Sequence, residues 1–144
     1  MNRLIVAEWS RIMGEARAIR DVVFIQEQGV PRELEWDEFD AVSWHAIAYN
    51  AEQRACGTGR LLPAQNGVGS IGRMAVLAEY RGQGVGAALL LALLERAQQR
   101  HDVGVRLHAQ THALGFYEKF GFVKEGKEYL EAGIPHYSMF KLCT

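Results

Sequence analysis

The sequence predicts an α+β fold in which helices lie on both faces of a mixed central β-sheet. An amphipathic helical segment comes early in the chain, and three strand-like runs then follow one another with no helix between them. The longest helical pattern starts only after a glycine-rich turn in the middle of the chain. This order differs from the regular strand–helix alternation of a dinucleotide-binding fold. The 144 residues fit one compact domain, for which we expect the bounds 1–144.

The first third of the chain combines one strand, one helix and an acidic loop. We expect a short strand at residues 4–8 and a helix at residues 9–24. A turn ends at Pro31, and a loop rich in carboxylates follows from Glu33 to Asp40. The helix is predicted because its apolar residues recur at spacings of three and four, at Ile12, Ala16, Ile19 and Val23.

Three strands are expected next, at residues 44–49, 55–62 and 70–76, joined by turns at residues 49–53 and 63–69. The glycine-rich segment then leads into a helix over residues 87–100. The last elements are a strand at 103–109, a short helix at 111–120 that Gly121 ends, and closing strands at 122–125 and 137–142.

Two features within the middle strands have structural explanations. His45 lies on an apolar strand, where we expect a buried, hydrogen-bonded histidine with a structural role. Gly57 and Gly59 mark close packing, a β-bulge or a close approach by a ligand, and packing is the interpretation we prefer.

The composition excludes several classes of function. Sixteen basic and seventeen acidic side chains give a formal net charge of -1, so no electrostatic surface for nucleic acid or an anionic membrane is expected. No run reaches the roughly 18 apolar residues that span a bilayer, and residues 1–8 lack the apolar core of a signal peptide. We therefore expect a cytoplasmic protein, with Cys56 and Cys143 as reduced thiols.

The glycine-rich segment is the strongest local signal. Gly82, Gly84 and Gly86 remove side chains where backbone N–H groups would approach a ligand, and they open a helix whose N-terminus favours an anion. Such a loop suits a pyrophosphate, although glycine-rich turns before helices also arise from packing. A P-loop would end in Gly-Lys-Ser/Thr, where this chain has Ala87 and Ala88, and a dinucleotide site would need an acidic residue after the next strand.

Two separate motifs resemble the GNAT family of N-acetyltransferases. The first is the strand Met74-Ala75-Val76 followed by the loop Arg81-Gly82-Gln83-Gly84-Val85-Gly86. The second is the later segment Ala113-Leu114-Gly115-Phe116-Tyr117-Glu118-Lys119-Phe120-Gly121-Phe122. Two more segments, residues 20–31 and residues 131–136, together with Glu35, Asp37, Asp40 and His45, are similar to the ElaA-like branch of that family. The resemblance covers essentially the whole chain and implies the GNAT acyl-CoA N-acyltransferase fold.

This resemblance implies a cofactor site for acetyl-CoA, used as a co-substrate without a metal ion. The backbone of Met74, Ala75 and Val76 would pair with the pantetheine arm, and an N–H of Met74 or Ala75 would support the oxyanion. The pyrophosphate would bind the loop formed by Arg81, Gly82, Gln83, Gly84, Val85 and Gly86. The side chains of Met74 and Val76 are expected in the core.

The resemblance also implies a general acid. Tyr117 would protonate the departing thiolate, since a phenol is fully protonated at neutral pH. The alternative for Tyr117 is an aromatic side chain packed with Phe116 and Phe120.

The general base is open among Glu27, Glu33 and His136. Glu27 could instead cap a helix end, and His136 could instead be an exposed loop histidine. The acidic loop at 33–40 has two interpretations, either an attractor for a cationic amine or charged surface with Trp36 and Phe39 packed down.

The function that follows is acetyl transfer to a primary amine of a small molecule or peptide, by direct attack on the thioester. The alternative is a non-catalytic domain that binds or senses acyl-CoA. The sequence gives no nucleic-acid or membrane partner, and it leaves the acceptor and the oligomeric state open, with a homodimer as one option.

Overall fold

A computed structural model describes residues 2–143, so Met1 and Thr144, the ends of the expected domain, lie outside the described residues. Its centre is a seven-stranded sheet in the order β1-β2-β3-β4-β5-β7-β6. Neighbouring strands are antiparallel except for the parallel pair β4–β5. The strands are β1 Arg3–Glu8, β2 Trp44–Tyr49, β3 Ala55–Gln65, β4 Val68–Val76, β5 Gly104–Gln110, β6 Val123–Glu131 and β7 Ile134–Leu142.

Four α-helices and four helical turns of π or 3-10 type complete the described chain. The α-helices are α1 Trp9–Arg20, α2 Arg32–Glu35, α3 Val85–Gln99 and α4 Leu114–Glu118. The turns are the π-helix η1 Asp21–Glu27 and the 3-10 turns η2 Asp40–Val42, η3 Ala78–Tyr80 and η4 Thr111–Ala113. The predicted mixed sheet with helices on both faces is therefore confirmed.

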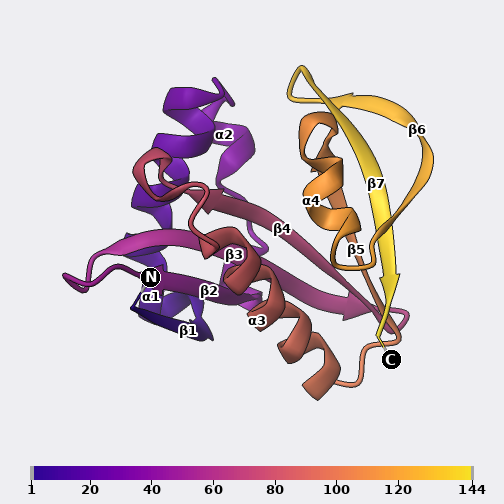
Figure 1. Cartoon of the computed structure of the whole chain (residues 1–144), viewed down its shortest axis with the longest axis horizontal. Helices are drawn as coiled ribbons and strands as arrows, with labels where there is room; N and C mark the ends of the chain where they lie inside the picture. The colour runs from indigo at the N-terminus through magenta and orange to yellow at the C-terminus, as the bar shows by residue number, and fades with distance from the viewer. Residues whose placement is uncertain (1, 144) are drawn as a thin grey trace.

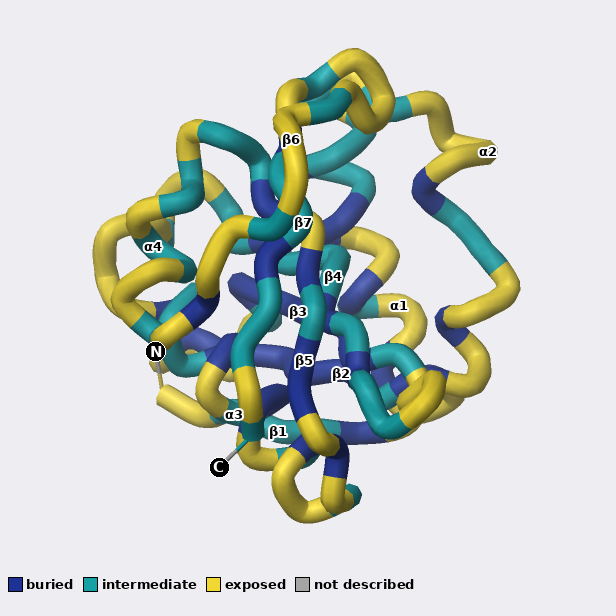
Figure 2. The backbone as a smooth tube through the Cα atoms, turned by 90° about the vertical axis from the view of Figure 1, so that its right-hand side faces the viewer, coloured by how far each residue is buried: buried dark blue, intermediate teal, exposed yellow. Residues whose placement is uncertain are grey.

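Strand β2 shows why both faces of the sheet are covered. Successive side chains of a strand point to opposite faces, and all of residues 45–49 are buried. Ala46 and Ala48 pack in the cluster that contains Leu89 of α3, whereas Ile47 packs with Ile12 of α1. Figure 1 shows α1 and α3 on opposite sides of the sheet, and Figure 2 shows that the buried residues concentrate in its central strands.

The sheet opens between its two central strands. Strands β4 and β5 pair only where Val68–Ile71 lies beside Gly104–Leu107. Beyond this point β4 continues along β3 while β5 continues along β7, so the two halves of the sheet diverge as a V (Figure 1). Among the strands described in residues 2–143, none pairs with the edge of residues 72–76 that faces away from β3.

Several expected boundaries were wrong. The first helix is α-helical only to Arg20 and continues as the π-helix η1, whose wider turn changes the side-chain spacing on which the prediction depended. The expected turn at 63–69 is only the Asn66–Gly67 turn, because Pro63 lies at an irregularity of the β3–β4 ladder where no N–H is needed. Strands β6 and β7 extend to a tight hairpin at Ala132 and Gly133, both at positive φ.

Gly57 and Gly59 are explained by close packing of α3 and β4 against β3. A Cβ on Gly57 would lie 2.9 Å from a methyl of Val85, and one on Gly59 would lie 2.5 Å from the Met74 sulfur. The preferred interpretation is confirmed, and a bulge lies beside Gly59 as well.

Candidate active site

A cleft of about 730 Å³ occupies the V between the two halves of the sheet. One wall is formed by residues 71–76 of β4 with η1 and α2, and the other by the end of β5, α4 and the β6–β7 hairpin. Two side chains join these walls, since Gln110 Nε2 donates to Gln28 Oε1 at 2.9 Å. The cleft therefore brings together segments that are far apart in the sequence.

The glycine loop lies at one end of this cleft. Gly84 is the N-cap of α3 with φ +83°, and Gly82 has φ +76°, so both adopt a backbone conformation that disfavours other residues. A Cβ at either position would meet no atom within 4 Å, so the loop's surface is open there. The first N–H groups of α3 have no intrahelical partner, and they suit an anion.

The remaining loop residues have different surroundings. Val85 is buried in the core, so only its backbone is available to a ligand. Gln83 donates to the Glu79 carbonyl at 3.1 Å. Gly86 lies within α3, where a Cβ would be 3.6 Å from the Phe116 ring, so the start of α3 and the helix α4 are close neighbours.

Arg81 connects the loop to η1. Its Nε donates to the Val76 carbonyl at 2.9 Å, and its Nη2 donates to Glu27 Oε1 at 2.8 Å. All three residues line the cleft. Glu27 is thus paired with a cation, which is different from the helix-capping contact that was its alternative.

Tyr117 lies on α4 and lines the same cleft as Arg81 and Gly86. Its ring meets Phe116 edge-on, with the ring centroids 5.0 Å apart, so the expected aromatic packing is present together with access to the cleft. Within residues 2–143 the Tyr117 hydroxyl makes no hydrogen bond. Burial raises the pKa of the Tyr117 phenol to about 12.

His136 is not an exposed loop residue, since it lies on β7, is buried and lines the cleft. Its Nδ1 is 2.6 Å from the Ile134 carbonyl, which can only accept, so Nδ1 carries the proton. Its Nε2 is 3.5 Å from Glu131 Oε2, and the Tyr129 ring stacks on the imidazole. Glu33, the third candidate base, is exposed on α2 and is not among the described residues that line the cleft.

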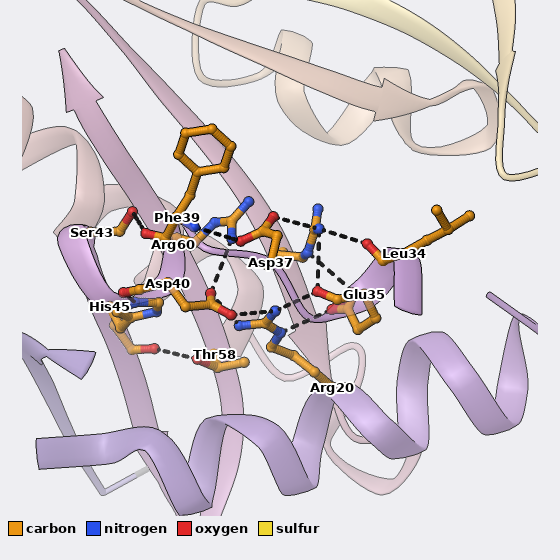
Figure 3. Close-up of polar contacts among 12 residues, drawn as sticks. Arg20, Leu34, Glu35, Asp37, Phe39, Asp40, Ser43, His45, Thr58 and Arg60 are labelled. Carbon is orange, nitrogen blue, oxygen red and sulfur yellow. Dashed lines mark hydrogen bonds and ion pairs between the residues drawn. The ribbon is translucent and has the colours of Figure 1, made fainter. Parts of the chain in front are cut away.

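Three of the five carboxylates in the acidic loop face arginines of the same chain, which favours the interpretation in which this loop packs down over the alternative of an attractor (Figure 3). Three arginines from α1, β3 and β4 face three carboxylates of the loop at 2.7 to 3.1 Å. We call this group the ion-pair network; it consists of Arg20, Arg60, Arg73, Glu35, Asp37 and Asp40. Burial alone would raise the pKa of Asp40, but hydrogen bonds and charge from Arg20, with Arg60, hold it below its ordinary value.

His45 adjoins this network and is structural, as expected. It is almost completely buried, and its Nε2–H donates to the Asp40 carbonyl at 2.9 Å. Burial, together with the charges of Arg20 and Arg60, lowers the pKa of His45.

Sequence reasoning missed two groups in the cleft. His108 of β5 and Tyr129 of β6 share a hydrogen bond, and His108 lines the cleft. The other is Arg73, a non-glycine residue at φ +52° inside strand β4. Neither has a local sequence signal, because a cross-strand pair and a bulge both depend on strand register.

No described helix has the length and apolar character required to cross a bilayer. Within residues 2–143 no three metal-ligating side chains gather into a site.

Comparison with known proteins agrees with this geometry. Residues 14–143 match the family model of the acetyltransferase (GNAT) domain. A Bacillus subtilis protein named as the uncharacterized N-acetyltransferase YjcF is 38% identical over 140 residues, which cover 96% of this chain and 99% of the relative.

Two solved structures share the fold over almost their whole length. Escherichia coli ElaA superposes with a TM-score of 0.88 at 27% identity, covering 98% of this chain and 99% of ElaA. An acyl-CoA N-acyltransferase from Pseudomonas aeruginosa gives a TM-score of 0.86 at 28% identity, covering 96% and 99%. The chain therefore belongs to the GNAT acetyltransferase family and is an acyltransferase with the acyl-CoA N-acyltransferase fold.

Proposed function

We propose that this protein transfers an acetyl group from acetyl-CoA to a primary amine of a small molecule or peptide, by direct attack of the amine on the thioester. The observation that carries the proposal is that the glycine loop, the free edge of β4 and Tyr117 all border one cleft. A pyrophosphate held at the start of α3 would place the pantetheine arm along β4, with its sulfur toward α4.

The loop and strand would hold the co-substrate mainly by backbone groups. Gly82, Gly84 and the first turn of α3 would bind the pyrophosphate through N–H groups. Arg81 uses two of its five N–H donors on Val76 and Glu27, and the others are available to a phosphate oxygen. The free edge of residues 74–76 offers N–H and C=O groups to the pantetheine amides, and an N–H of Met74 or Ala75 to the developing oxyanion.

Tyr117 would act as the general acid for the leaving thiolate. With a phenol pKa of about 12, transfer to a thiolate of pKa about 8.5 would be uphill by roughly 5 kcal/mol in water. Burial would also raise the pKa of the CoA thiol within the cleft, and this reduces the pKa difference between the phenol and the thiol. The phenol would therefore carry the proton that it donates at every pH at which the enzyme would work.

We assign the general base to His136 in preference to Glu27. The Ile134 carbonyl accepts from Nδ1–H, so in the neutral imidazole the lone pair is on Nε2, the nitrogen that lies 3.5 Å from Glu131 Oε2, and this nitrogen would accept the proton of an ammonium group in the cleft. Glu27 Oε1 already accepts a hydrogen bond from the Arg81 guanidinium at 2.8 Å, so this oxygen is committed to an ion pair beside the glycine loop.

The test is thiol release from acetyl-CoA with pooled primary amines, for the wild type and Tyr117→Phe. We expect kcat to fall by about 10²-fold or more in Tyr117→Phe, as for loss of a general acid, while CoA affinity measured by calorimetry changes little. His136→Gln should reduce kcat more than Glu27→Gln at neutral pH.

Two results would contradict the proposal. One is a folded wild type with no affinity for CoA. The other is tight CoA binding with no thiol release for any amine, which would favour the non-catalytic alternative.

A further inference from the structure

We infer that Arg73 is a positioning residue, whose side chain holds the backbone of β4 in the strained bulge that presents the oxyanion donor. The inference rests on the proposed function, in which the main chain at Met74 or Ala75 contacts the thioester oxygen. It concerns how this chain builds that geometry.

The bulge is visible in the strand register. Thr58 pairs with Ala75 and Arg60 pairs with Gly72, so Arg73 and Met74 together face the single residue Gly59. Such a bulge leaves main-chain groups out of the ladder. The partner strand on the other side, β5, has already diverged after Leu107, so these groups border the cleft.

The residue at the bulge is unusual. Arg73 has φ +52°, a conformation for which bulges of this kind normally use glycine. Gly72, the preceding residue, does not have a positive φ. The strain therefore falls on an arginine, and something must hold it there, because strained residues persist only when their surroundings determine them.

The ion-pair network provides that restraint. Arg73 Nη2 donates to the Leu34 and Glu35 carbonyls, both at 3.3 Å, and to Asp37 Oδ2 at 3.1 Å. Its Nε is 3.1 Å from Glu35 Oε2. The side chain is thus held by hydrogen bonds from Nη2 to three oxygen atoms of the acidic loop and by an ion pair with the Glu35 carboxylate. The loop is itself fixed by Arg20 and Arg60 (Figure 3).

The remaining network keeps its pairs when Arg73 is removed. Glu35 still contacts Arg20 at 2.9 Å, and Asp37 still contacts Arg60 at 2.7 Å. Substitution of Arg73 therefore leaves each carboxylate with an arginine partner but gives two cations for three carboxylates. This electrostatic cost is the same in every variant that removes the charge, so the difference between such variants reports on the bulge.

The test compares Arg73→Gly with Arg73→Ala. Glycine adopts positive φ without strain, so it should keep the bulge without any side-chain restraint, whereas alanine should let the strand relax. We expect Arg73→Gly to keep thiol release with pooled amines within about threefold of wild type, and Arg73→Ala to lose about tenfold or more in kcat, since loss of an oxyanion donor costs 10²–10³. The dissociation constant for CoA should change little in either variant.

A spectroscopic measurement needs no acceptor. Acetyl-CoA carrying a heavy carbon isotope at the carbonyl reports hydrogen bonding to the thioester oxygen through its infrared stretch. Binding should lower this frequency in the wild type and Arg73→Gly, and lower it much less in Arg73→Ala. Arg106→Ala, which removes a half-exposed ion pair with Glu125 outside the cleft, should behave as the wild type.

If Arg73→Ala does not fold, the comparison uses Arg73→Lys in its place. Lysine keeps the charge and the Cβ but lacks the planar guanidinium group that donates to several oxygen atoms at once. The inference then requires the glycine variant to be more active than the lysine variant. Equal losses in glycine and alanine (or lysine) variants, or no loss in any of them, would overturn it. Absence of CoA binding by the wild type would instead overturn the proposed function.

Discussion

At the scale of single residues, two buried histidines on strands differ in what their ring nitrogens face. His45 and His136 are both buried on strands and both bond a backbone carbonyl. The carbonyl fixes Nε2 as the donor in His45, within the ion-pair network, and Nδ1 as the donor in His136, within the cleft. The tautomer and the direction of each ring, which the sequence does not encode locally, decide which histidine is available to a substrate.

The lowered pKa of His45 predicts a pH dependence of stability. Because the folded pKa lies below the unfolded value of about 6.5, the unfolded chain binds more protons as pH falls through this range. The free energy of unfolding should therefore be greatest above about pH 6.5 and fall below it. His45→Gln keeps an N–H donor, on an amide group that does not titrate. The free energy of unfolding of this variant, measured by urea denaturation, should therefore fall less than that of the wild type below about pH 6.5. His112→Gln changes an exposed histidine, so its free energy of unfolding should fall with pH as that of the wild type does. If this free energy falls equally in all three proteins, His45 is not the group responsible.

At the scale of elements, the glycine loop and α3 illustrate two different uses of glycine. Gly82 and Gly84 supply positive φ at an open surface, whereas Gly86 lies within α3 without positive φ, and a Cβ there would make an ordinary van der Waals contact with Phe116. The sequence pattern predicted the loop and the helix it opens. It did not distinguish the two uses, because φ and the neighbours of a residue depend on the folded backbone.

Gly84→Ala should weaken CoA binding by about tenfold, equivalent to roughly 1.4 kcal/mol, because a Cβ at φ +83° disturbs the N–H groups at the start of α3. Calorimetry measures this affinity. The matched control is Gly126→Ala, which has φ +69° and equally open surroundings but lies on β6 away from the loop. Both variants should lose about 1–2 kcal/mol of stability. Equal CoA affinity in both would show that the loop does not contact the ligand.

At the scale of the whole molecule, the ion-pair network joins the end of α1, the acidic loop, β3 and β4. Arg20 and its partners Glu35 and Asp40 are at most 5% exposed at the side chain. The network therefore fixes one wall of the cleft against the sheet, and Arg20 is its most buried member.

Arg20→Met should destabilise the protein by about 3–5 kcal/mol, because it leaves buried carboxylates with fewer cations. Urea denaturation gives the value. Arg106→Met removes a pair whose side chains are 39% exposed, and it should cost less than about 1 kcal/mol. Similar losses in the two variants would mean that the network contributes no more than a surface pair.

Local patterns in the amino-acid sequence were enough to predict the α+β class, the glycine loop, the long helix and the short helix that carries Tyr117. These features depend on local periodicity, turn residues and motif order, which act over a few residues. Three features became visible only in the folded chain: β4 and β5 diverge, Arg73 lies in a bulge, and three carboxylates of the acidic loop pair with Arg20, Arg60 and Arg73. The reason is that strand register and the pairing of distant charges are settled when the whole core packs, between residues as far apart in the chain as Glu27 and Arg81, which are separated by 54 positions.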